Sequence, residues 1–297
     1  MNNKGLVCIA LSIIIALLSF SVLAEEEAAV PVVFEDALSE HFLADGEAPV
    51  ITDMSYLSEN LSIEISVTRE NRSDVYIADI WVRDLSLLRR GFGGGRWHSK
   101  MQKIATIAKQ ENAIIALTGD NGHNFDKGVV FANGKLLRKK ENRKRDVCVI
   151  MTDGRMEIIK GSELTADKVK ELDGQVWQSF LFGPNLFDDE GHARTKFTDG
   201  IGPANPRSVI GYYEPGHYCL IQIDGRGTKS IQGGKNVGMT LKQLAAYMES
   251  LGCKAAYNLD GGQSALMWFN GKVISHPYNG GRTVGDIVYL TDKTAAD

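Results

Sequence analysis

Apolar and polar residues alternate along several short segments of the chain. Alternation at 61–67 predicts a half-buried strand, a second strand at 75–82 follows a turn, and the apolar run at 113–117 predicts a buried strand. Asn-Gly at 133–134 and Asp-Gly at 153–154 each lie between apolar residues, which is a strong hairpin signal. The pattern therefore predicts many strands joined by tight turns.

Helical spacing of apolar residues is rarer than alternation. It occurs at 100–112 and most clearly at 240–251, where Thr240 is the expected N-cap and Gly252 the expected C-terminal stop. Because strands outnumber helices and no internal repeat is present, the sequence predicts an α+β fold. We expect a single large domain at 56–297, with a mixed, mainly antiparallel β-sheet core flanked by a few helices.

The first 55 residues differ from the rest. Lys4 precedes an apolar run at 6–23, which ends in Ala24 and three glutamates. This pattern predicts a secretory signal at 1–24, with an uncleaved membrane anchor as the alternative, because the run is nearly long enough to cross a hydrocarbon layer of about 30 Å. Both alternatives imply a secreted or extracytoplasmic protein. Residues 25–55 are acidic and weakly patterned, so we expect a stalk or pro-segment there.

Composition narrows the class of protein. The 297 residues are 43% hydrophobic and 24% charged, which is ordinary for a globular protein, and the formal net charge is −4. That charge offers no general attraction for nucleic acid, so we expect no nucleic-acid partner. A mean hydropathy of −0.15 excludes a polytopic membrane protein.

Three cysteines remain after the predicted signal, and all lie in apolar stretches. The spacings of Cys148, Cys219 and Cys253 match neither a zinc ribbon nor a disulfide-rich scaffold. We expect buried thiols that pack as small hydrophobic groups, and the alternative is one disulfide with one thiol left over.

Polar residues that suit chemistry lie where predicted strands end. Arg207 is in an Asn-Pro-Arg-Ser segment, Asp224 and Arg226 follow an apolar strand, and Arg282 follows two glycines. Individually, Asp-Gly pairs mostly make turns and arginines mostly lie at the surface. Three arginines in one site would hold a phosphate group by paired N–H donors.

The segment 258–264, Asn-Leu-Asp-Gly-Gly-Gln-Ser, is the richest in polar groups. Side chains alternate along a strand, so Asn258 and Asp260 are expected on one face. Gly261 and Gly262 let the backbone approach a ligand and present N–H groups, and Ser264 adds a hydroxyl. This combination suits an anionic sugar derivative.

These segments together resemble the phosphodiester glycosidase family, which includes the mannose 6-phosphate uncovering enzyme and many exported bacterial proteins. The matching segments occur in the family order and span about residues 60–292. They are Thr-Gly-Asp at 118–120, Phe-Gly-Pro at 182–184, Asn-Pro-Arg-Ser at 205–208, Ile-Asp-Gly-Arg at 223–226, Gly-Met-Thr-Leu at 238–241, 258–264, Phe-Asn-Gly-Lys-Val at 269–273 and Gly-Arg at 281–282.

The resemblance implies a hydrolase that cleaves the bond between a sugar's anomeric carbon and a phosphodiester, in an envelope or extracellular glycan. Its substrate would be a sugar phosphate or phosphoglycan. Asp260 is then the first candidate for carboxylate nucleophile or base, Asp224 the second and Asp120 the third. The substrate-binding candidates are Arg207, Arg226, Asn258, Gly261, Gly262, Ser264 and Arg282.

The chain departs from the family pattern at Thr118, Gln263 and Ala265, where members usually carry Asn, Gly and Ser. These changes support an alternative function, a non-catalytic protein that binds glycans or sugar phosphates. We expect no metal or other cofactor, although Asp120, Asp224 and Asp260 could together hold a hard cation such as calcium. A basic run at 138–145 is expected as a solvated hairpin flank, or as a contact with an anionic wall polymer.

Overall fold

The computed structural model describes residues 28–34, 38–121, 126–198 and 200–293. The predicted signal or anchor, residues 1–24, lies outside the described residues. Within the described part of the chain, no helix has the length and apolar character needed to cross a membrane.

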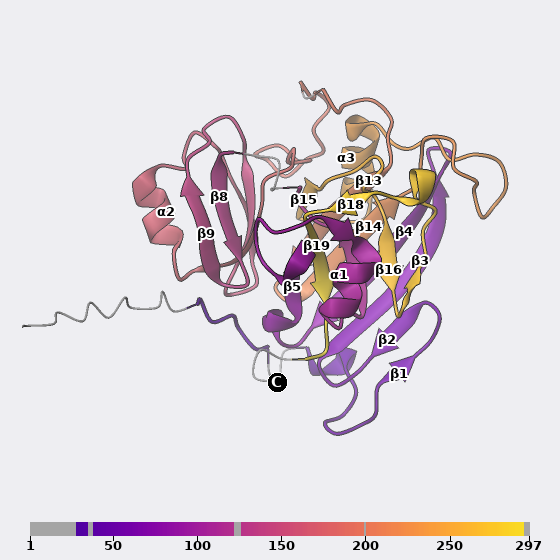
Figure 1. The fold of residues 1–297 in the computed structure, drawn as a ribbon, viewed down its shortest axis with the longest axis horizontal. Coiled ribbons are helices and arrows are strands. Elements are labelled where there is room, and N and C mark those ends of the chain that lie inside the picture. Colours follow the sequence, from indigo (N-terminus) through magenta and orange to yellow (C-terminus); the bar gives the residue numbers. More distant parts are fainter. Residues whose placement is uncertain (1–27, 35–37, 122–125, 199, 294–297) are drawn as a thin grey trace, which may run out of the picture.

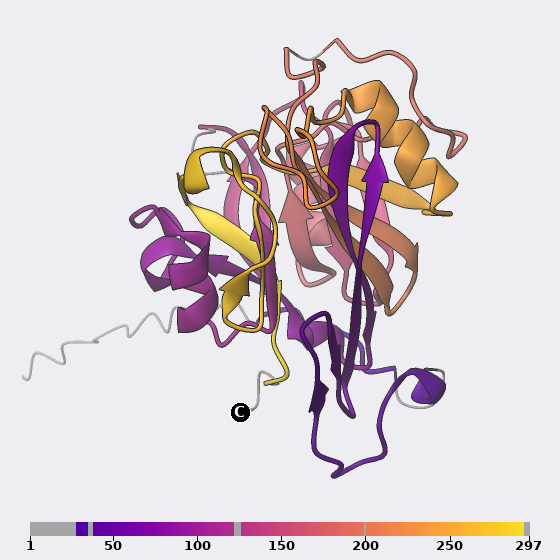
Figure 2. The same ribbon diagram turned by 90° about the vertical axis from the view of Figure 1, so that its right-hand side faces the viewer.

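Two antiparallel sheets form the centre of the molecule (Figures 1 and 2). In order across the larger sheet, the strands are β1 (Val50–Ile51), β2 (Ser55–Leu57), β3 (Leu61–Glu70), β4 (Ser73–Val82), β14 (His217–Ile223), β13 (Arg207–Glu214) and β15 (Ala255–Asn258). The smaller sheet contains β17 (Lys272–Val273), β16 (Met267–Phe269), β7 (Ile115–Thr118), β19 (Asp286–Leu290) and β5 (Leu88–Phe92). The fold is α+β, as the alternating pattern predicts.

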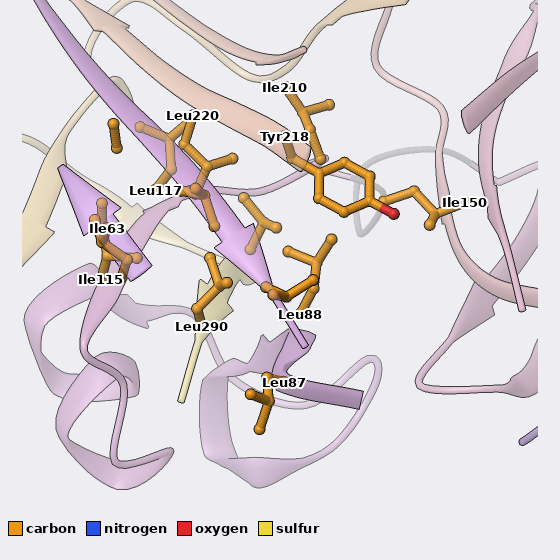
Figure 3. Close-up of a cluster of buried hydrophobic side chains, with 14 of the residues drawn as sticks. Ile63, Leu87, Leu88, Ile115, Leu117, Ile150, Ile210, Tyr218, Leu220 and Leu290 are labelled. Atoms are coloured by element: carbon orange, nitrogen blue, oxygen red, sulfur yellow. The ribbon is translucent and has the colours of Figure 1, made fainter. Parts of the chain in front are cut away.

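The main hydrophobic core lies between these two sheets (Figure 3). Ile63 and Leu220 contribute from the larger sheet, and Leu117 and Leu290 from the smaller one; all four side chains are buried. Each sheet has a helix on its outer face. α3 (Leu241–Ser250) covers the larger sheet and α1 (Ile104–Gln110) covers the smaller one.

A smaller unit with its own apolar cluster lies beside the sheets (Figure 1). It contains the pair β8 (Gly128–Ala132) and β9 (Lys135–Lys140), the sheet of β10 (Val147–Met151), β11 (Met156–Ile159) and β12 (Val176–Phe180), and the helix α2 (Ala166–Leu172). A further short antiparallel pair consists of β6 (Gln102–Lys103) and β18 (Thr283–Val284). In the chain, β6 directly precedes α1 and β18 precedes β19. The 3₁₀ helices are η1 (Ser39–His41), η2 (Leu85–Leu87), η3 (Gly93–Gly95) and η5 (Tyr278–Gly280).

Local sequence signals agree with the observed elements. The turn at Asn133 and Gly134, both with positive φ, joins β8 to β9, and the Asp-Gly at 153–154 lies between β10 and β11. Thr240 caps α3 in a capping box with Gln243, and Gly252 follows the helix with a positive φ of +81°.

Residues expected in the stalk or pro-segment contact the sheets. The backbone N–H groups of Ala29, Val32 and Phe34 donate to carbonyls of Gly134, Thr152 and Arg83 respectively. β1 and β2 continue the same region as the edge of the larger sheet. The described part of the segment therefore lies along the domain, and its role as a pro-segment stays a prediction.

All three cysteines of the described chain are buried free thiols, as predicted. Cys219 Sγ and Cys253 Sγ are 3.9 Å apart, which is a contact and not a bond.

Candidate active site

Strand register brings the predicted site segments to one end of the larger sheet. Arg207 pairs with Ile223 across β13 and β14, and Val209 pairs with Asn258 across β13 and β15. Because these pairs are antiparallel, β13 begins where its two neighbours end. The segments that follow β14 and β15 therefore lie beside Arg207.

A cavity of about 280 Å³ opens at this end of the sheet. Six of the predicted residues contribute charge or backbone to its wall. Its lining consists of Phe182, Ile201, Asn205, Arg207, Arg226, Asp260, Gly261, Gly262, Gln263 and Arg282. Three arginines and one carboxylate thus share a small space.

Asp260 and Arg282 form an ion pair in this cavity. Arg282 Nη2 donates to Asp260 Oδ2 at 2.8 Å, and Arg282 Nε donates to the hydroxyl of Ser264. The Asp260 side chain is 7% exposed, and this burial raises the pKa of its carboxyl, against the effects of Ser264 and Arg282. Ser264 does not line the cavity; it orients the guanidinium that does.

Arg207 is buried and forms part of the cavity wall. Its Nε and Nη2 donate to backbone carbonyls of Met239, Ile201 and Pro203, at distances of 2.9, 2.7 and 2.6 Å. Burial, and then the charge of Arg226, lower the pKa of Arg207 to about 10, so it stays protonated at neutral pH. Among the described residues, its Nη1 has no hydrogen-bond partner and is available to a ligand.

Arg226 lies at the rim and is exposed. Its Nε donates to Asn205 Oδ1 at 3.0 Å, and its guanidinium lies 5.4 Å from the ring centroid of Tyr278. The amide and the ring hold the arginine over the cavity while leaving its terminal nitrogens on the ligand side.

The two glycines of 258–264 differ in what their backbones do. The N–H of Gly262 donates to the carbonyl of Pro206 at 2.9 Å, so it is engaged and not free for a ligand as we expected. A Cβ on Gly261 would lie 2.7 Å from that same carbonyl, so only glycine fits this approach. Gly262 has φ +62°, and a Cβ there would lie 2.9 Å from Arg226 Nη2.

A model of the phosphodiester glycosidase family matches residues 109–291, which is more than half of the chain and includes the whole cavity lining. The chain belongs to the phosphodiester glycosidase family. A relative, the SPbeta prophage-derived uncharacterized protein YomE of Bacillus subtilis (strain 168), is 25% identical over 186 residues. That match spans 60% of this chain and 28% of YomE.

Two solved structures share the fold of this chain. The catalytic domain of zebrafish N-acetylglucosamine-1-phosphodiester alpha-N-acetylglucosaminidase superposes with a TM-score of 0.61 at 18% identity, over 90% of this chain and 87% of that one. A hypothetical protein from Synechocystis superposes with a TM-score of 0.58 at 12% identity, over 83% of this chain and 64% of that one.

Asn258 does not reach the cavity. Its amide Nδ2 donates to the carbonyl of Gly183 at 2.7 Å, and its backbone N–H donates to the carbonyl of Pro184. The side chain is fully buried and fixes the segment that carries Phe182, a wall residue. We expected Asn258 to bind ligand beside Asp260, but its amide holds the backbone at Gly183 instead.

Asp224 also lies outside the cavity. Its Oδ2 accepts the backbone N–H of His276 at 2.9 Å, and the His276 ring is 3.6 Å away. Burial raises the pKa of this carboxyl to about 6, which the two His276 contacts oppose. Asp224 therefore contacts the segment that leads from His276 to Tyr278 and Arg282.

Asp120 is fully buried beneath the site, in a cluster with Arg90 and Asp286. Arg90 Nη2 donates to Asp286 Oδ2 and is 4.0 Å from Asp120 Oδ2. Burial raises the pKa of Asp120 to about 7, since the single guanidinium is shared with Asp286. Asp120 Oδ1 accepts the N–H groups of Leu181 and Phe182, both at 2.6 Å, so this residue also supports the Phe182 wall.

The three predicted aspartates do not gather into a cation site. Over the described ranges, the one group of three or more His, Cys, Asp or Glu residues with ligand atoms within 4.8 Å of one another is Asp74, Asp224 and His276. Asp74 is already bound by Arg69, Ser230 and Asn236. The hypothesis of a hard cation held by Asp120, Asp224 and Asp260 is therefore wrong in its ligand set.

Sequence reasoning missed several residues of the site. Arg90 and Asp286 lie in ordinary strand patterns, and no local signal marks them as charged partners inside the core. Tyr278 precedes the predicted Gly-Arg segment at 281–282 by only a few residues, yet its role depends on the approach of Arg226. Asn205 belongs to the Asn-Pro-Arg-Ser motif, and its side chain accepts a hydrogen bond from Arg226, a role that the motif alone does not indicate.

Proposed function

We propose that the protein hydrolyses the bond between a sugar's anomeric carbon and a phosphodiester. The observation that supports this most is the placing of Asp260 with Arg207, Arg226 and Arg282 on one small cavity, in a chain of the phosphodiester glycosidase family. The name of the zebrafish relative describes the same reaction class for that protein. We further propose that the protein is exported through residues 1–24 and acts on an envelope or extracellular glycan.

The arginines would hold the phosphodiester. Arg207 offers Nη1 from a rigid, buried position, and Arg226 offers its terminal nitrogens from the rim. Guanidinium groups donate paired N–H bonds to phosphate oxygens, which fixes the orientation of the group as well as its charge. The leaving phosphate monoester is a weak base, so the reaction needs its charge stabilised more than it needs a proton donor.

Asp260 would act on the sugar. It is the only carboxylate, among the described residues, that lines the cavity. As bond cleavage places positive charge on the anomeric carbon, an adjacent carboxylate stabilises that charge or forms a bond to the carbon. Arg282 favours the ionised carboxylate and so opposes the effect of burial, and Ser264 keeps Arg282 in position.

A binding protein without turnover remains the second candidate. The observation that favours it is Gln263, which lines the cavity where family members usually carry glycine. A side chain there occupies space next to the phosphate-binding arginines. Hydrolysis distinguishes the two functions, because both predict affinity for the same ligand.

The test is a panel of sugar 1-phosphodiesters offered to the purified protein, beginning with N-acetylglucosamine 1-(methyl phosphate). We expect release of free sugar from at least one compound, with and without a chelator. The variant Asp260→Asn is expected to lose at least about 10²-fold in turnover, while the exposed control Asp53→Asn keeps the parent rate. Binding without sugar release would support the second candidate, and full activity of a folded Asp260→Asn protein would contradict the assigned role.

A further inference from the structure

A second, positively charged cavity adjoins the candidate active site. It has a volume of about 170 Å³ and is lined by residues of the β9–β10 loop and of the segment after β12. Lys144, Arg145 and Arg194 contribute three positive charges to its wall, against one carboxylate from Asp146. Phe182 lines both cavities, so they lie on either side of one residue.

Two of the three cations are held in place by backbone carbonyls. Arg145 Nη1 donates to the carbonyl of Phe182 at 2.9 Å, and Arg194 Nη1 donates to the carbonyl of Asn185 at 2.9 Å. The Arg194 guanidinium also lies 5.0 Å from the ring centroid of Phe197. These contacts orient the charges before a ligand arrives, which reduces the entropy lost on binding.

The backbone of Phe182, which lines both cavities, is held by residues on either side. The N–H of Phe182 donates to the buried Asp120, and the carbonyl of Phe182 accepts from Arg145. One residue thus separates a cavity with three arginines from a cavity with three cations. A ligand that carries two anionic groups could place one on each side of Phe182.

The positive character ends beyond this second cavity. The next cavity shares Asp146 and Arg194 with it. It is also lined by Asp188, Asp189 and Glu190, against Lys160 and Lys254, so acidic side chains outnumber basic ones there. Acidic groups there oppose a third phosphate. The charge pattern therefore favours one additional anion.

From this arrangement we propose that the second cavity binds a further phosphodiester in the aglycone of the substrate. The inference rests on the proposed function, and it names the substrate class as a glycan whose phosphodiesters recur along the chain. The first cavity takes the phosphodiester that is cleaved, and Lys144, Arg145 and Arg194 take its neighbour. The basic loop next to β9 is then part of the substrate path.

The test compares two probes for affinity by calorimetry on the Asp260→Asn protein, which is used so that turnover does not interfere. One probe is N-acetylglucosamine 1-(methyl phosphate). The other replaces the methyl group by glycerol that carries a second methyl phosphodiester. We expect the two-phosphate probe to bind at least about fivefold more tightly at low salt, and this gain to shrink as salt screens the charges.

Charge reversal then locates the gain. Lys144→Glu changes an exposed side chain and is expected to weaken the two-phosphate probe about fivefold more than the one-phosphate probe. The matched control Lys140→Glu makes the same charge change at the end of β9, at an exposed residue that lines neither cavity, and should keep the gain.

Equal affinity of the two probes for the Asp260→Asn protein would overturn the proposal. Equal weakening of both probes by Lys144→Glu, or the same loss in Lys140→Glu, would also overturn it. If the parent protein cleaves neither probe but the affinity gain and its loss in Lys144→Glu persist, the proposed hydrolysis fails while the second phosphate site stands.

Discussion

Arg282 has two partners that a single lysine could not hold. Its Nη2 donates a hydrogen bond to Asp260 and its Nε donates one to Ser264. The planar guanidinium is therefore oriented by Ser264 while it holds the carboxylate in position. Asp260 is nearly buried, and burial alone would favour the protonated, non-nucleophilic form. The charge of Arg282 opposes this effect and favours the ionised carboxylate.

The variant Arg282→Lys tests this role. It retains the positive charge but cannot bridge both partners, so we expect turnover of the sugar 1-phosphodiester to fall by about 10²-fold. Steady-state kinetics measure the change. The control is Lys242→Arg, on the exposed face of α3, which should keep the parent rate. Parent-like kinetics in Arg282→Lys would show that the bidentate geometry is dispensable.

Asp224 gives the protein a pH-dependent stability. Its pKa is about 6 in the folded protein against an ordinary value of 3.8, so the folded state binds this proton more tightly. The contribution of Asp224 to stability is therefore complete below pH 4 and is lost as the pH rises through 6. A shift of this size corresponds to about 3 kcal/mol.

We expect the free energy of unfolding of the parent to fall, from pH 4 to pH 7, by about 3 kcal/mol more than that of Asp224→Asn. Urea unfolding at several pH values measures both. The exposed control Asp53→Asn should follow the parent curve. Parallel curves for the parent and Asp224→Asn would contradict a raised pKa at this residue.

At the residue scale, motifs located the site better than they assigned its parts. Asp260 and the three arginines meet in one cavity, as the sequence predicted. Asn258 was expected beside them, but its amide binds Gly183 instead. A sequence pattern indicates which residues lie near one another, whereas a hydrogen-bond partner depends on loops that approach from elsewhere in the chain.

At the element scale, the start of β13 is packed closely against the segment after β15. A Cβ on Gly261 would lie 2.7 Å from the Pro206 carbonyl, next to Arg207. Backbone atoms have little freedom to move aside, so a methyl group there must displace the start of the strand.

The variant Gly261→Ala should therefore reduce substrate binding through Arg207 and raise KM by about tenfold, because small displacements of positioning groups are costly. The matched control is Gly200→Ala, where an added Cβ meets open space. Circular dichroism checks that both variants fold. An unchanged KM in Gly261→Ala would mean that the two segments separate without affecting the site.

Elements were predictable wherever one periodicity dominated. The alternation at 61–67 became β3, and the stripe of apolar residues in 240–251 became α3 with its Thr240 cap. Register was not predictable, because the pairing of β13 with both β14 and β15 joins segments up to about fifty residues apart. This register places Arg207, at the start of β13, next to Asp260, which follows β15.

At the scale of the whole molecule, the site needs both sheets. Arg207 begins a strand of the larger sheet, whereas Arg282 precedes β18 and the smaller sheet. The backbone N–H of Asp260 donates to the carbonyl of Gly119, which directly follows β7 of the smaller sheet, at 3.1 Å. The packed core between the sheets thus sets the distance between the phosphate-binding arginines and the carboxylate.

The buried cluster below the site shows why this level of organisation escapes sequence reasoning. Arg90, Asp286 and Asp120 come from three separate segments and meet without solvent. Their charges fit only because the core places them together, since an isolated buried charge is strongly unfavourable. Patterns in a single sequence indicate which apolar residues are buried, but they do not indicate which charged residues contact one another in the core.

The most direct test of the account is the position of bond cleavage. N-acetylglucosamine 1-(methyl phosphate), or the sugar preferred in the panel, is hydrolysed in ¹⁸O-labelled water and the released methyl phosphate is examined by ³¹P NMR. Attack at the anomeric carbon, assisted by Asp260, predicts methyl phosphate without the heavy isotope. Labelled phosphate would show cleavage at phosphorus and would contradict a glycosidase, as would the absence of any hydrolysis across the panel.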